Sequence, residues 1–186
     1  MRKNGALPEL LAPAGSPEAL RAAIEGGADA VYFGGAAFNA RMRAANFTAD
    51  TMREAVSLCH AYGVKTYITL NTLCRDRELP DFLCAAKEAY LAGADALIVA
   101  DLGGAAAIRR AFPDFELHAS TQMSGHNIAA AGELAKCGFT RMVLARETPA
   151  RDIRYFAEHS GLETEIFVHG ALCVSHSGQC LFSSLV

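Results

Sequence analysis

Long apolar runs, blocks of basic residues and tryptophan are all absent from this sequence of 186 residues. No uninterrupted apolar run approaches the roughly 18 residues of a membrane span. No apolar stretch follows the two N-terminal cations, as a secretory signal would require. The net charge of −3 and the scattered Lys and Arg residues indicate no general nucleic-acid surface, although one face can still carry a basic patch for an RNA substrate. We expect a cytoplasmic protein that does not span a membrane, and the sequence leaves its oligomeric state open.

The six cysteines do not have the spacing of a zinc ribbon. In a chain of this length without a secretory signal, they favour a reduced, cytoplasmic protein. Cys59, Cys84 and Cys137 fall in predicted helices among apolar neighbours, so we expect them in the core. Cys74 follows a predicted strand and is either an additional metal ligand or a surface thiol.

A repeated unit organises the chain: a helix-like stretch ends in glycine, and a short apolar run follows. It occurs at residues 25–35, 61–71, 91–101, 136–146 and 159–170. Glycine suits the left-handed position after a helix, and short continuous apolar runs are typical of parallel strands covered on both faces. Residues 8–14 and 115–121 add two strands, which makes seven. Amphipathic helices are predicted at 17–26, 49–62, 80–92, 103–111, 126–137 and 149–159, with Ser16-Pro17 and Thr148-Pro149 as start signals.

Strict alternation of strands and helices with short links predicts an α/β fold. A doubly wound sheet of this size usually has a phosphate-binding G-x-G-x-x-G loop, which the sequence lacks. A (β/α)8 barrel of the TIM type is therefore favoured, and such a barrel typically has about 250 residues. We expect residues 1–186 to form the N-terminal part of a barrel domain with about seven strands. The remainder of the barrel and a C-terminal region would then lie outside this chain.

In such a barrel, functional groups lie at the carboxyl ends of the strands, and alternate residues point inward. In the last predicted strand, Glu165, Phe167 and His169 are expected to face inside. The fifth strand presents His118, Ser120 and Gln122 on one face. Polar residues also end the third, fourth and sixth strands: Asn71, Asp101 and the pair Arg146-Glu147. From these groups we select His169, Glu165, Gln122 and Asn71 as candidate catalytic residues.

A long loop after the second predicted strand reaches the same rim, and long loops are often functional. Its polar residues of interest are Asn39, Arg41, Arg43 and Asn46. Together with Arg146 and Glu147, they are the candidate substrate-binding residues, since arginine binds carboxylates and phosphates. The alternative is a solvated loop whose arginines pair with nearby acids.

The end of the chain carries the most specific pattern, EIFVHGALCVSHSGQCLFSS at residues 165–184. Cys173 and Cys180 follow a barrel strand in a loop without helical period, where thiolates can wrap a metal cluster. By spacing alone they are equally well two free loop cysteines.

This block resembles the signature of the collagenase-like peptidases of unknown mechanism, family U thirty-two. The matching residues are Glu165, Phe167, Gly170, Ala171, Leu172, Cys173, Gly178, Cys180 and Ser183. The segments PELLAPAG, GADAVYFG, NARMRAANF and LARE also resemble the family and occur in its order. The resemblance therefore covers nearly the whole chain.

The resemblance implies an enzyme of one of several kinds. Founding members are described as collagenase-type proteases, whereas similar proteins hydroxylate a base of tRNA or 23S rRNA, or a ubiquinone precursor, without molecular oxygen. It implies a 4Fe-4S cluster held by four cysteines. Cys173 and Cys180 match two of these ligands, and the other two would lie beyond residue 186. It also implies prephenate as a co-substrate in the tRNA branch.

On this basis we expect an RNA-base hydroxylase that acts on RNA together with a small organic acid. Arg41, Arg43 and Arg146 would bind an anionic oxygen donor, and His169 would shuttle a proton.

Proteolysis of a peptide substrate is the first alternative, and it requires a nucleophile, a base and an oxyanion site. Cys173 or Cys180 could pair with His169 or His176, but no Asp or Asn follows in the segment to orient the imidazole. The zinc motif H-E-x-x-H is absent as well. Ubiquinone-precursor hydroxylation is a further alternative. So is a non-catalytic barrel fragment, which would not explain the polar strand ends.

Overall fold

The computed structural model describes residues 7–40, 46–170 and 173–180. In these parts of the chain, strands and helices alternate from end to end. The strands are β1 (Leu11–Pro13), β2 (Ala30–Gly34), β3 (Lys65–Leu70), β4 (Ala96–Val99), β5 (Glu116–Ala119), β6 (Arg141–Val143) and β7 (Glu163–Glu165). The α-helices are α1 (Pro17–Glu25), α2 (Ala49–Ala61), α3 (Leu79–Ala92), α4 (Leu102–Ala111), α5 (Ile128–Lys136) and α6 (Ala150–His159). Short 3-10 helices precede two of them, η1 (Asp76–Glu78) and η2 (Thr121–Met123).

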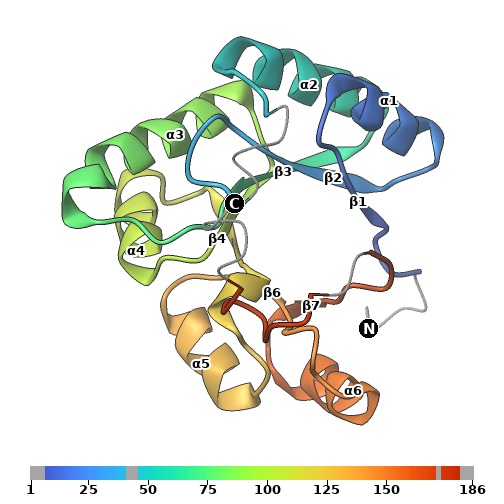
Figure 1. Ribbon diagram of the computed structural model, residues 1–186, viewed down its shortest axis with the longest axis vertical. Coiled ribbons are helices and arrows are strands. Elements are labelled where there is room, and N and C mark those ends of the chain that lie inside the picture. The colour runs from blue at the N-terminus through green and yellow to red at the C-terminus, as the bar shows by residue number, and fades with distance from the viewer. Residues whose placement is uncertain (1–6, 41–45, 171–172, 181–186) are drawn as a thin grey trace.

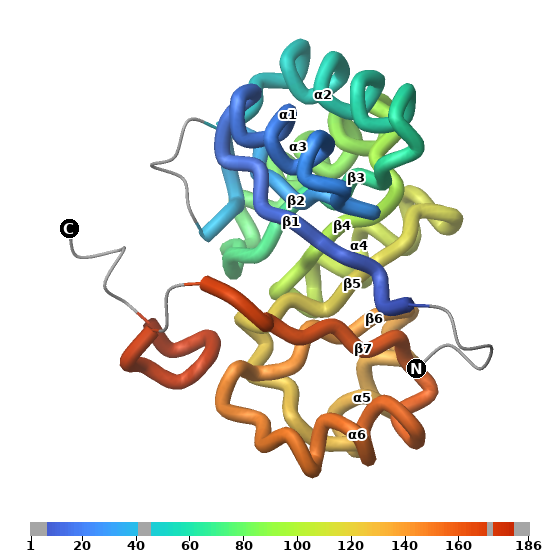
Figure 2. Tube along the Cα trace, turned by 90° about the vertical axis from the view of Figure 1, so that its right-hand side faces the viewer, coloured from blue at the N-terminus to red at the C-terminus, as the bar shows by residue number. Residues whose placement is uncertain are grey.

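The strands form one parallel sheet in the order β1-β2-β3-β4-β5-β6-β7. Figure 1 shows the sheet curving into an incomplete barrel with the helices on its outer side. The two edge strands, β1 and β7, both face the viewer in Figure 2. The predicted α/β fold of the TIM-barrel type, incomplete in this chain, is confirmed.

In each repeated unit, the glycine that follows the helix adopts the left-handed conformation that the sequence predicts. The φ angles are 82° at Gly27, 72° at Gly63, 83° at Gly93, 87° at Gly138 and 73° at Gly161. A residue with a Cβ is strained at such angles. These glycines therefore follow α1, α2, α3, α5 and α6 where the chain turns back toward the sheet, whereas α4 has Phe112 as its C-cap.

Two local predictions at helix starts have different outcomes. The Ser16 hydroxyl accepts a hydrogen bond from the Ala19 backbone N–H at 3.2 Å, as an N-cap does. Thr148 does not repeat this device, because α6 begins one residue later and its N-cap position is Pro149. Thr148 Oγ1 is buried without a hydrogen-bond partner in the described structure.

The seventh strand is shorter and lies earlier than predicted. Only Glu163–Glu165 pair with β6, with Val143 opposite Glu165. Ile166 and Val168 alternate with the residues that were predicted to face inside, and both are exposed, Val168 to 82%. The apolar sequence after Glu165 has the composition of a strand, yet pairing with β6 ends there.

Strand residues divide between two sides of the sheet. Side chains between the sheet and the helices form the main core, among them Val31, Ile68, Leu97 and Met142. Full burial of such a side chain contributes about 1.5–3 kcal/mol. A smaller cluster, with Ala30, Tyr67 and Ala96 at its centre, lies on the inner side of the curved sheet.

The cysteines are placed only partly as predicted. Cys59 is buried in α2, but Cys84 and Cys137 are exposed, so the prediction of core positions is wrong for these two. Cys84 lies on the solvent side of α3, whose buried residues are Phe82, Ala86 and Ala89, and Cys137 caps the end of α5. Among the described residues, no helix is long and apolar enough to span a membrane.

Candidate active site

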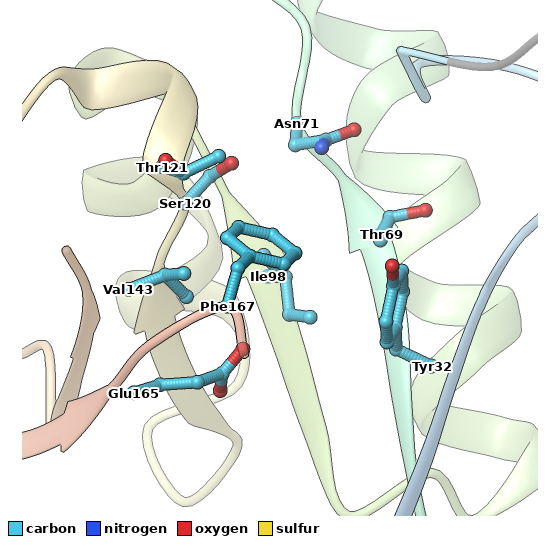
Figure 3. A pocket seen from close by; sticks show the side chains of 9 residues that line it. All are labelled: Tyr32, Thr69, Asn71, Ile98, Ser120, Thr121, Val143, Glu165 and Phe167. Carbon is cyan, nitrogen blue, oxygen red and sulfur yellow. The ribbon is translucent and has the colours of Figure 1, made fainter. Parts of the chain in front are cut away.

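A small cavity opens at the carboxyl ends of the strands, on the inner side of the sheet (Figure 3). Its lining residues come from β2 to β7 and the loops that follow them: Tyr32, Thr69, Asn71, Ile98, Ser120, Thr121, Val143, Glu165 and Phe167. Its volume is about 50 Å³, which holds a few water molecules or the edge of a small ligand. Alternation along the strands brings these side chains together.

Glu165 is the acid of this cavity, and its side chain is half-buried. Its Oε2 atom has no hydrogen-bond partner in the described structure and lies 3.6 Å from Nη1 of Arg141. Burial raises the pKa of Glu165 to about 7, and the nearby Glu9 carboxylate acts in the same direction. Arg141 opposes this shift without reversing it. A carboxyl group with such a pKa can both donate and accept a proton near neutral pH.

Arg141 lies below Glu165 and joins two segments that are far apart in the sequence. Its Nη1 donates a 2.7 Å hydrogen bond to Glu9, just before β1, and its Nη2 donates a 2.6 Å hydrogen bond to Glu163 on β7. The guanidinium lies 5.1 Å from the ring centroid of Tyr67, and the Tyr67 hydroxyl donates to Glu9 at 2.9 Å. Only 8% of the Arg141 side chain is exposed, so these partners compensate an otherwise costly buried charge.

His118, predicted to face the interior, does so below the cavity. Its ring packs edge-on against Tyr67 at a centroid distance of 4.7 Å, and its Nε2 lies 3.2 Å from Glu116. Burial lowers the pKa of His118, an effect that Glu116 partly offsets. The imidazole is therefore neutral at physiological pH.

The loop after β2 is anchored by two of the candidate residues. Asn71 Oδ1 accepts a 2.9 Å hydrogen bond from the Ala40 backbone N–H, and Asn39 Nδ2 donates to the Gly35 carbonyl at 2.6 Å. Asn39 is buried and lies against Gly34, where a Cβ would come within 2.6 Å of it. Asn46 is half-buried at the far end of the loop. Arg41 and Arg43 lie outside the described residues.

Arg146 and Glu147 contact the cysteine loop, residues 173–180. Ser177 is its buried centre, with 1% exposure. The Ser177 hydroxyl donates to Glu147 Oε2 at 2.9 Å, and its backbone N–H donates to Oε1 at 3.1 Å. The Arg146 backbone N–H donates to the same hydroxyl at 3.1 Å, and its guanidinium donates to the Ser175 carbonyl at 3.4 Å.

The cysteine loop also packs against the segment that follows β5. Ser124 donates from its hydroxyl to the Ser177 carbonyl. Gly178 has φ of 77°, and a Cβ there would lie 2.2 Å from the Gln122 carbonyl oxygen. Gln122 is exposed next to Thr121, which lines the cavity, whereas His169 is exposed and outside the lining. The cysteine loop therefore lies beside the mouth of the cavity.

Cys173 and Cys180 are near enough for Cys180 to affect the titration of the Cys173 thiol. Hydrogen bonds from the Ser175 backbone, from Cys180 and from Arg146 lower the pKa of the Cys173 thiol. A lowered thiol pKa and a second cysteine nearby suit two ligands of one metal centre. In the part of the chain that the structure describes, no third Cys, His, Asp or Glu joins them in a group that could hold a metal ion.

Several residues of the site were missed from the sequence. Tyr32, Thr69 and Arg141 occupy inward positions within β2, β3 and β6, which strand alternation alone could indicate. Ser177 was missed as well. Its role as an anchor has no sequence signal, because it depends on a partner 30 residues away.

Comparison with known proteins links this arrangement to a family. The model of peptidase family U32 matches residues 15–186. A tRNA hydroxylation protein of Bacillus subtilis is 42% identical over 95% of the chain, and a 23S rRNA 5-hydroxycytidine synthase of Escherichia coli is 44% identical over 94%. A collagenase of Porphyromonas gingivalis is 35% identical over 94% of the chain.

The solved structure of a U32 peptidase has the same fold, with a TM-score of 0.69 at 13% identity, over 89% of this chain and 70% of that one. The chain spans less than half the length of the three curated relatives: 42%, 26% and 44%, respectively.

Proposed function

Because the chain belongs to peptidase family U32, we propose that it supplies the barrel of an enzyme that hydroxylates a base of RNA. The observation that carries the proposal is the docking of the cysteine loop beside the mouth of a cavity with uncharged hydrogen-bonding groups. The relatives named for hydroxylation of tRNA and 23S rRNA support it. Further residues outside this chain would complete the barrel and the substrate surface.

A 4Fe-4S cluster is the cofactor that we propose for the full-length protein. Cys173 and Cys180 would supply two of its four ligands, and the lowered pKa of the Cys173 thiol fits that role. When bound, such a cluster supplies electron transfer for chemistry without molecular oxygen. Glu147 and Arg146 would support it by holding the cysteine loop against the barrel.

We assign separate roles in substrate binding and proton transfer to the residues at the cavity and on its rim. Asn71, Ser120 and Thr121 offer uncharged donors and acceptors to the edge of a base. Glu165 lies below them as the candidate acid and base. A small organic acid such as prephenate would be the co-substrate, and we assign its carboxylates to Arg41 and Arg43, because Arg146 already donates to the cysteine loop.

Proteolysis remains the second candidate because of the collagenase relative. A cysteine or serine protease needs its nucleophile within hydrogen-bonding reach of a base. Among the residues that the structure describes, no serine hydroxyl or cysteine thiol is hydrogen-bonded to a histidine side chain. The one buried serine of the cysteine loop, Ser177, donates to Glu147 instead.

The test is mass spectrometry of total tRNA and rRNA from a strain that lacks the full-length gene. We expect one hydroxylated nucleoside to disappear and to return with the wild-type gene, but not with Cys173→Ser or Cys180→Ser. Cys84→Ser, at an exposed position on α3, should restore the modification fully. Anaerobically purified wild-type protein should contain iron and absorb visible light. Unchanged RNA together with loss of gelatin cleavage would favour proteolysis. Unchanged RNA together with altered ubiquinone precursors would favour hydroxylation of a ubiquinone precursor.

A further inference from the structure

The cavity contains an acid with one carboxyl oxygen that has no hydrogen-bond partner in the described structure. Among the described lining residues, Glu165 has the only carboxyl group, and its Oε2 has no partner. Its side chain is only 16% exposed, so bulk water cannot fully replace the missing contact. Buried polar atoms are almost always hydrogen-bonded, and exceptions are frequent at functional sites. Glu165 is therefore arranged to bond to a group that enters the cavity.

Arg141 could neutralise Glu165, but its short hydrogen bonds go to two other carboxylates. Nη1 bonds to Glu9 at 2.7 Å, while Nη2 and Nε both bond to Glu163, at 2.6 Å and 3.0 Å. The remaining separation of 3.6 Å to Glu165 is an ion-pair distance and exceeds a hydrogen bond. One guanidinium thus faces three carboxyl groups. Glu165, which receives none of its short hydrogen bonds, keeps its proton most easily.

Within the described parts of the chain, the other charged or titratable groups near this acid come from β2, β3 and β5. Tyr32 of β2 lines the cavity with it, and Lys65 of β3 lies 3.6 Å from Glu9. Tyr67 donates to Glu9, and burial raises the pKa of its hydroxyl. On β5, His118 pairs with Glu116 rather than with Glu165. Oε2 of Glu165 has no hydrogen-bond partner among the described residues, so a proton on this oxygen is available to the cavity.

We propose that Glu165 is the proton donor of the cavity and that Arg141, held by Glu9 and Glu163, is the residue that positions it. The inference rests on the proposed function and specifies the occupant: an uncharged ring with a nitrogen or carbonyl oxygen that gains a proton during the reaction. The O–H bond of Glu165 breaks as an N–H or O–H bond forms on the ring. The carboxylate left behind lies 3.6 Å from Arg141, which stabilises its charge.

The first test measures the proton without any substrate. Infrared spectra of the full-length protein in heavy water should show the carbonyl stretch of a buried protonated carboxyl group that fades as pH rises through about 7. Glu165→Gln should abolish this band, and Glu133→Gln, at an exposed position on α5, should leave it unchanged. A band that survives in Glu165→Gln, or its absence from the wild type, would overturn the inference.

Two further variants separate positioning from simple structural support. Glu9→Gln removes a negative charge next to Glu165 and frees Arg141, so the midpoint of the band should move to lower pH. Arg141→Lys keeps the charge but loses the planar geometry, and the midpoint should move to higher pH. These shifts do not depend on Glu165→Gln folding correctly. Unmoved midpoints in both variants would refute the positioning role.

The second test uses the reaction. If RNA hydroxylation is detected, kcat/KM should fall as pH rises through the same midpoint, and Glu165→Gln should lower it by about a hundredfold or more. Hydroxylation at the wild-type rate in Glu165→Gln would overturn the inference and leave the proposed function intact. A titrating carboxyl band without any change in RNA would refute the proposed function and support the assignment of the proton to Glu165.

Discussion

The hydroxyl of Ser177 donates a 2.9 Å hydrogen bond to Oε2 of Glu147, and this contact joins the cysteine loop to the end of β6. The Ser177 backbone N–H adds a bond to the other carboxylate oxygen at 3.1 Å. Glu147 therefore holds the loop by both its side-chain oxygens. Hydrogen bonds to a charged acceptor are stronger than those between neutral groups, so this carboxylate is well suited to keep the two cysteines in place.

Replacing Ser177 with alanine should release the cysteine loop while the barrel stays folded. The change removes the hydroxyl that donates to Glu147 and accepts from Arg146, at a local cost of about 1–3 kcal/mol. Hydrogen exchange followed by mass spectrometry should show faster exchange in residues 173–180 and unchanged exchange in the strands. Ser57→Ala, on the surface of α2, is the matched control. Equal protection of the loop in both variants would show that the contact is dispensable.

Acid should weaken the same contact in a defined pH range. Burial opposes ionisation of Glu147, but hydrogen bonds from its own backbone N–H, from Ser177 and from His176 lower its pKa to about 2 from an ordinary 4.5. A lowered pKa in the docked state means that docking is fully favoured above pH 4.5 and is lost as pH falls toward 2. Loop exchange, corrected for its intrinsic pH dependence, should therefore accelerate below about 4.5 in the wild type. In Glu147→Gln, the amides of residues 173–180 should exchange quickly at neutral pH, and their corrected exchange rate should change little with acid.

The barrel was predictable because its information is local and repeated. Gly63 and Gly93 each end a helix at a position that only glycine adopts easily, and continuous apolar runs such as 96–99 mark buried parallel strands. Neither signal depends on distant residues. The same local logic failed at β7, because residues after Glu165 have strand composition but no pairing with β6.

The site was less predictable because its contacts are distant in sequence. Inward alternation correctly placed Glu165 and Phe167 at the cavity, but it could not show that Arg141 reaches Glu9, 132 positions away. Arg146 and Glu147 were selected as substrate-binding residues from their position alone. Their hydrogen bonds to Ser175 and Ser177 became visible only once the loop was placed in space.

Removing Arg141 should destabilise the whole barrel. Arg141→Met would leave Glu9 and Glu163 without their buried cation, and breaking such a pair costs about 3–5 kcal/mol. Urea unfolding of the full-length protein should show a correspondingly lower midpoint. Arg53→Met removes the cation of an exposed pair on α2 and should cost less than about 1 kcal/mol. Similar losses in the two variants would mean that the interior network contributes no more than a surface ion pair.

A single methyl group at Gly178 should displace the cysteine loop, because both backbone strain and a steric clash oppose it. Gly178 has φ of 77°, and the new Cβ would lie 2.2 Å from the Gln122 carbonyl oxygen, a backbone atom that cannot rotate away. Gly178→Ala should therefore reduce the iron content of the anaerobically purified full-length protein and accelerate exchange in residues 173–180. Gly132→Ala adds the same methyl group within α5, where no atom lies within 4 Å of the new Cβ. That control should retain iron and gain about 0.5–1 kcal/mol of stability, because alanine favours a helix over glycine. Normal iron content in Gly178→Ala would show that iron binding does not depend on the position of the cysteine loop.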